Sequence, residues 1–73
     1  MMKMEAVASS GIKEIGHDPA TNKMRVKFGS GSVYEYDDVP AEKHAALVSA
    51  KSIGHAFREN FLKSGDHGVT RIS

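Results

Sequence analysis

The sequence contains no cysteine and no tryptophan, and it has only two prolines among its 73 residues. Without cysteine, neither a disulfide nor a thiolate zinc site can stabilise the fold. No apolar run approaches the roughly 18 residues that a membrane helix needs, and residues 1–6 lack a secretory apolar region. We therefore expect a soluble cytoplasmic protein with no membrane partner.

An excess of charge of one sign is also missing. Ten Lys and Arg residues stand against nine Asp and Glu residues, which leaves a formal net charge of +1. Dedicated nucleic-acid binders commonly carry a basic excess, because neutralisation of phosphates drives their affinity. Any nucleic-acid contact of this chain therefore has to come from a local cluster of basic residues.

The most informative stretch is the pattern of residues 23–36. Apolar residues alternate with basic ones along its first half: Met24, Val26 and Phe28 against Lys23, Arg25 and Lys27. This period predicts a strand with one apolar face, followed by a glycine-serine turn and a second strand.

The turn length decides the register of this hairpin. A three-residue turn at Gly29–Gly31 aligns apolar with apolar and basic with acidic residues, in the pairs Val26–Tyr34, Met24–Tyr36, Arg25–Glu35 and Lys23–Asp37. A two-residue turn would mix the faces and lose the charge pairs. The longer turn is favoured, and it directs Tyr34 and Tyr36 toward the core.

Further elements flank the hairpin. A strand is expected over residues 12–17, joined to the hairpin by the turn Asp18–Asn22. Ile12 and Ile15 are three apart, so that strand needs a bulge near Gly16 or an edge position buried on both sides at one point. A helix is expected from Pro40 to about residues 50–51, and a second from its cap Ser52 to about Lys63, with Gly65 just past its end.

The predicted fold class is α+β, a three-stranded antiparallel meander followed by two helices packed on one face (β-β-β-α-α). Residues 1–8 show no period and are expected to be flexible, residues 9–63 to form the single domain, and residues 64–73 to form a tail. The tail either forms a short terminal strand or stays loose. A single domain of this size is expected to be marginally stable by itself.

The order of several short motifs resembles the KTSC domain, a family named for its occurrence at the C-terminus of some lysyl-tRNA synthetases and found also as stand-alone bacterial and phage proteins. The motifs are Ser9-Ser10 before Ile12, Ile15–Asp18, the alternating residues 24–28, Tyr34-Glu35-Tyr36, Val39-Pro40, and Ser52-Ile53-Gly54 before Phe57. Association with the synthetase has suggested RNA binding, and the resemblance implies that activity as an expectation for this chain.

The chain also departs from the pattern that it resembles. His17 stands where the family usually has Tyr, His44 where relatives often carry an aromatic residue, and Arg58 where relatives often have Asn. Relatives usually continue after Phe61 with a basic residue and a Tyr-containing tail, whereas this chain has Leu62–Asp66. If the family's C-terminal residues make its contacts, part of them is lost here.

Each candidate residue has a structural interpretation beside the functional one. Tyr34 and Tyr36 could stack on bases, but the register favours packing beneath the helices with only the hydroxyl rims accessible. The basic row could contact phosphates, or it could be a solvated face balanced by Glu35 and Asp37. Four histidines, at positions 17, 44, 55 and 67, show neither a helical i, i+4 pair nor an HExxH pattern, so no metal site is expected.

The sequence therefore predicts a small non-enzymatic binding module without a cofactor. The leading hypothesis is weak contact with RNA or another nucleic acid, through Arg25, Lys27, Tyr34, Tyr36, Arg58 and Lys63. The alternative is a protein-interaction module, either a phage- or plasmid-borne modulator of a host protein or a self-associating domain such as a homodimer.

Overall fold

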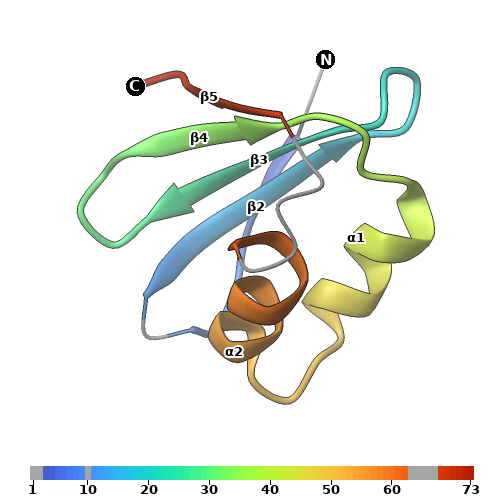
Figure 1. The fold of residues 1–73 in the computed structure, drawn as a ribbon. Helices are drawn as coiled ribbons and strands as arrows, with labels where there is room; N and C mark the ends of the chain where they lie inside the picture. Colours follow the sequence, from blue (N-terminus) through green and yellow to red (C-terminus); the bar gives the residue numbers. More distant parts are fainter. Residues whose placement is uncertain (1–2, 10, 63–67) are drawn as a thin grey trace.

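The computed structural model of the protein describes residues 3–9, 11–62 and 68–73. Within these ranges, five strands form one antiparallel sheet in the order of the chain. The strands are β1 (Lys3–Ala6), β2 (Ile12–Asp18), β3 (Lys23–Phe28), β4 (Val33–Tyr36) and β5 (Val69–Arg71). The helical segments α1 (Ala41–Val48), α2 (Ile53–Phe57) and the π-helical η1 (Arg58–Leu62) lie on one face of the sheet (Figure 1). The fold class is α+β, as predicted.

The predicted three-stranded meander is wrong in its strand number. Four strands precede the helices and a fifth follows them. Strand β1 lies within residues 1–8, which were expected to be flexible, and β5 lies in the tail, where the sequence left a short strand open. Both are short edge strands with mostly exposed side chains, so neither shows an apolar period. Backbone pairing with β2 and β4 holds these two strands in place, and the local sequence pattern does not predict that pairing.

Strand β2 contains a bulge, but at Lys13 rather than near Gly16. Ile12 lies opposite Phe28 and Glu14 lies opposite Lys27, so Lys13 is the extra residue. The bulge brings Ile12 and Ile15 onto the same face, where they are only 3% and 1% exposed. Because β2 lies between β1 and β3, the alternative of an edge strand is wrong.

The register of the β3–β4 hairpin is confirmed. Met24 pairs with Tyr36, Val26 with Tyr34 and Arg25 with Glu35. The turn closes with a hydrogen bond of 2.9 Å from the Gly31 amide to the Phe28 carbonyl, and Gly31 has a φ of 98°. This left-handed conformation is the reason that glycine ends the three-residue turn.

The core is built around an aromatic cluster between the sheet and α2. The Phe57 ring lies 5.7 Å from that of Phe28 and 5.4 Å from those of both Tyr36 and Phe61. Helix α2 begins as predicted, because the Ser52 Oγ accepts a hydrogen bond of 3.3 Å from the His55 amide. The helical segment then continues as η1, and the predicted end at Lys63 and Gly65 lies outside the described residues. In the described part of the chain, every helix is too short or too polar to cross a bilayer.

Two histidines join α1 to the sheet. The His17 and His44 rings stack with their centroids 4.8 Å apart and their planes at 11°, and His17 Nε2 donates to the Val39 carbonyl at 2.6 Å. Burial lowers the pKa of His44, and the neighbouring His17 lowers it further, against a smaller opposing effect of Glu5. The fold therefore favours neutral His44.

Stability is expected to fall when the pH drops through the range in which this histidine titrates. Because the pKa of His44 is lower in the folded chain than the ordinary 6.5, the unfolded chain takes up the proton first as the pH falls. The contribution of His44 is complete above pH 6.5 and is lost as the pH falls toward the folded pKa. In His44→Phe, which keeps a ring against His17, the urea midpoint should change less between about pH 7.5 and about pH 5 than in the wild type.

The control is the same substitution at exposed His55, which should keep the wild-type pH dependence. Equal slopes of midpoint against pH in the wild type and His44→Phe would contradict the role of the histidine pair.

Candidate functional site

The basic row of the sequence lies on the open face of the sheet, opposite the helices. Arg25 Nε donates to Glu35 Oε2 at 2.7 Å, and Lys23 Nζ lies 3.4 Å from Glu35 Oε1 and 3.8 Å from Asp37 Oδ1. The hydrogen bond from Arg25 lowers the pKa of Glu35, burial opposes it, and Lys23 adds to the lowering. Lys27 lies opposite Glu14 on the neighbouring strand. Lys23 and Arg25 are therefore held in cross-strand charge pairs, whereas Lys27 forms no ion pair among the described residues.

The two tyrosines lie on the other face, and they differ in accessibility. Tyr36 is 2% exposed, and its ring packs at 5.4 Å from that of Phe57 and 6.0 Å from that of Phe61. Burial raises the pKa of its hydroxyl, and Tyr34 raises it further. Tyr34 is half-buried, with its ring edge-on to Phe28 at 5.7 Å. Tyr36 is thus a core residue, whereas Tyr34 keeps an accessible rim.

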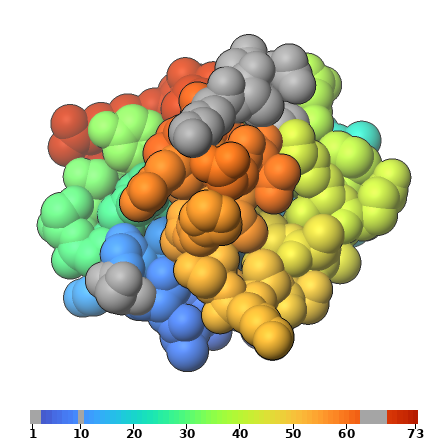
Figure 2. Space-filling model, turned by 60° about the horizontal axis from the view of Figure 1, so that its bottom comes forward, coloured from blue at the N-terminus to red at the C-terminus, as the bar shows by residue number. Residues whose placement is uncertain are grey.

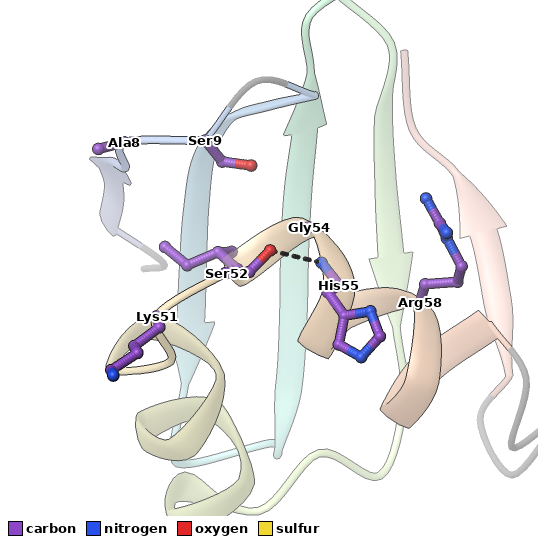
Figure 3. Close-up of a pocket in the computed structure, with 8 residues that line it drawn as sticks. Ala8, Ser9, Lys51, Ser52, Gly54, His55 and Arg58 are labelled. Carbon is purple, nitrogen blue, oxygen red and sulfur yellow. Dashed lines mark hydrogen bonds between the residues drawn. The ribbon is translucent and has the colours of Figure 1, made fainter.

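Arg58 lies where two hollows adjoin on the helix side of the molecule. The first hollow, of about 330 Å³, is lined by polar and cationic residues that include Ser9, Lys51, Ser52, His55 and Arg58 (Figure 3). The second, of about 200 Å³, is lined mainly by apolar residues that include Ile12, Phe28, Phe57 and Leu62. Gly54 and Arg58 line both hollows. We call the first the cationic hollow and the second the apolar hollow.

The cationic hollow exists because two distant segments of the chain meet. On the surface seen in Figure 2, α2 (orange) lies beside the residues that precede and begin β2 (blue). A Cβ atom added at Gly54 would lie 3.5 Å from the Ser9 Oγ, so the Ser9 side chain lies next to the backbone of α2 at Gly54. The Ser9 and Ser52-Ile53-Gly54 motifs, which the sequence comparison singled out separately, therefore form one site.

The two formal charges that line the cationic hollow, those of Lys51 and Arg58, are both positive. Lys51, His55 and Arg58 all have exposed side chains, and none of the described residues lining the hollow carries a carboxylate. Neither Lys51 nor Arg58 forms an ion pair within the part of the chain that the structure describes. Hydroxyl groups of Ser9 and Ser52 add hydrogen-bonding capacity. The hollow is suited to a small anion.

The six predicted site residues are divided by the sheet. Arg25 and Lys27 are on the open face, Tyr34, Tyr36 and Arg58 are on the helix side, and Lys63 lies outside the described residues. Sequence reasoning missed Lys51 and His55, whose joint position only the packing of α2 on the N-terminal segment reveals. The feature of the sequence that could have indicated this site was the pair of serine motifs at Ser9 and Ser52. Among the described residues, no three His, Asp or Glu side chains gather as metal ligands.

The arrangement defines a class of small two-layer α+β domain, with an antiparallel sheet covered on one face by helices. The model of the KTSC domain matches residues 8–64, and the chain belongs to the KTSC family. A crystal structure of a KTSC domain protein from Yersinia pestis superimposes with a TM-score of 0.89 over the whole of both chains, at 32% identity.

Two curated relatives are similar in sequence. An uncharacterised protein of Stutzerimonas stutzeri is 40% identical over 60 residues, which cover 82% of this chain and 84% of that protein. A protein of Tsukamurella paurometabola is 39% identical over 51 residues, which cover 70% of this chain and 76% of the relative. Their descriptions assign no activity.

Proposed function

We propose that this KTSC domain is a non-enzymatic module that binds single-stranded nucleic acid through the surface around Arg58. RNA is the first candidate ligand. The observation that carries the proposal is an exposed guanidinium without an ion-pair partner among the described residues, at the junction of the cationic and apolar hollows. Single-stranded nucleic acids combine phosphates, which bind cations, with bases, which pack on aromatic and apolar side chains. One surface offers both kinds of contact here.

The helix side supports this proposal better than the open face of the sheet. On the open face Arg25 is already paired with Glu35, and the aromatic residues of the sheet point the other way. We therefore replace Arg25, Lys27 and Tyr36 in the proposed contact set by Lys51, His55 and Phe28, and keep Arg58 and the rim of Tyr34. The protein-interaction alternative and the homodimer stay predictions from the sequence.

A titration of labelled single-stranded RNA, followed by fluorescence anisotropy from about 20 mM to about 150 mM salt, tests the proposal. Binding is expected at low salt and should weaken steeply as salt rises. Lys51→Gln and Arg58→Gln should each weaken low-salt binding about three- to tenfold, because each removes a phosphate contact.

Lys27→Gln is the matched control, since it makes the same change as Lys51→Gln on the opposite face of the sheet. It should change binding less than about twofold. No binding by the wild type at the lowest salt would overturn the proposal, and an equal loss in Lys27→Gln and Lys51→Gln would place the contact elsewhere.

A further inference from the structure

The cationic hollow carries a more specific inference, which rests on the proposed function. We infer that this hollow is a site for one phosphomonoester, the terminal phosphate of an RNA strand or of a free nucleotide. Lys51 and Arg58 supply the charge, and the Ser9 hydroxyl and the His55 ring supply hydrogen-bonding groups. The site so defined is built by residues from two segments of the chain rather than by one surface helix.

The balance of charge distinguishes a terminal from an internal phosphate. An internal phosphodiester carries one negative charge and is met by single Lys or Arg contacts along a backbone. A phosphomonoester carries about −1.5 to −2 at neutral pH and has three strong acceptor oxygens. Lys51, His55 and Arg58 all line one hollow, spread around it rather than directed at one point (Figure 3), and no described carboxylate lines it. The concentration of donors matches the dianion.

The size of the cationic hollow and its position beside the apolar hollow support the same ligand. The cationic hollow, at about 330 Å³, has room for a phosphate group together with part of a ribose. Gly54 and Arg58 form its boundary with the apolar hollow, where the half-buried Phe28 is partly accessible to a ligand. A nucleotide whose phosphate lies near Lys51 therefore directs its base toward the apolar hollow. The arrangement fits the end of a strand, because the phosphate occupies the hollow and the chain of nucleotides leaves past Arg58.

Gly54→Ala is the substitution that best separates phosphate binding from stability of the fold. A methyl group at this position would lie 3.5 Å from the Ser9 Oγ, an ordinary contact distance, so Gly54→Ala fits the fold. Alanine also raises helix propensity by up to about 1 kcal/mol over glycine. The same methyl group reduces the space shared by the two hollows. Gly54→Ala should therefore keep or raise the thermal midpoint while it weakens the phosphate contact.

The experiment compares ligands that differ only in the phosphate. The full chain is titrated with adenosine 5′-monophosphate, adenosine and inorganic phosphate, with amide signals followed by NMR, and with one RNA sequence carrying either a 5′-phosphate or a 5′-hydroxyl. The monophosphate and inorganic phosphate should shift the signals of Gly54, His55 and Arg58, whereas adenosine alone should not. The 5′-phosphorylated RNA should bind at least about fivefold more tightly than the 5′-hydroxyl strand.

Each outcome decides one of the two proposals. Equal affinity of the two RNAs, with no shifts from the monophosphate, overturns the phosphomonoester site and leaves the proposed RNA binding intact. Shifts from the monophosphate without binding of either RNA overturn RNA binding and assign the hollow to a free nucleotide. Lys51→Gln and Gly54→Ala should lose the preference for the 5′-phosphate, and Lys27→Gln should keep it. A folded Gly54→Ala with the full preference would contradict the placement of the phosphate in this hollow.

Discussion

Replacing Phe57 by alanine is expected to leave the chain largely unfolded at room temperature. The Phe57 side chain is 2% exposed, and its ring contacts those of Phe28, Tyr36 and Phe61. Truncation of a buried Phe to Ala costs about 3–5 kcal/mol, since transfer energy is lost and a cavity remains. Small domains lie at the low end of the usual range of about 5–15 kcal/mol for the free energy of unfolding. Circular dichroism and urea unfolding measure the loss.

Leu62→Ala provides the control for this prediction. Leu62 belongs to the continuation of the same helical segment, but it is 57% exposed. Its truncation should change the free energy of unfolding by less than about 0.5 kcal/mol. If Phe57→Ala and Leu62→Ala had the same urea midpoint, the placement of Phe57 at the centre of the core would be wrong.

Truncation of Ile12 to alanine is expected to have the second-largest effect. Ile12 is 3% exposed, because the extra residue Lys13 brings it onto the same face as Ile15 and opposite Phe28. Truncation of a buried Ile to Ala costs about 2–5 kcal/mol. Urea unfolding of Ile12→Ala against the wild type measures the loss.

Lys13→Ala at the neighbouring position is the control. Lys13 is exposed, so this variant should unfold within about 0.5 kcal/mol of the wild type. If Ile12→Ala were as stable as Lys13→Ala, the placement of Ile12 in the core would be wrong.

The β3–β4 hairpin could be predicted to its register because the information is local. Its apolar alternation and opposite charges lie within a few residues of one another, and a glycine stands where the turn needs a positive φ. The cap of α2 is local in the same sense, since the Ser52 Oγ bonds to an amide three residues later. Where the contacts join residues that are close in the sequence, the sequence alone is sufficient to predict them.

The position of the bulge could be inferred only in part. The spacing of Ile12 and Ile15 left two alternatives, a bulge near Gly16 or an edge strand buried on both sides at one point. The register against β3 identifies Lys13, because Glu14 lies opposite Lys27 directly after Ile12 lies opposite Phe28. The partner strand supplies the missing information.

By itself, the sequence determined the α+β class, the hairpin register and the start of α2, all of which follow from contacts between near neighbours. Only the tertiary structure decided that β1 and β5 are strands, since edge strands are held by the backbone of their neighbours rather than by an apolar period. It also separated Arg25 from Arg58 and brought Ser9 to Gly54. A binding surface depends on which distant segments pack together, and that is fixed by burial of the shared core rather than by any local pattern.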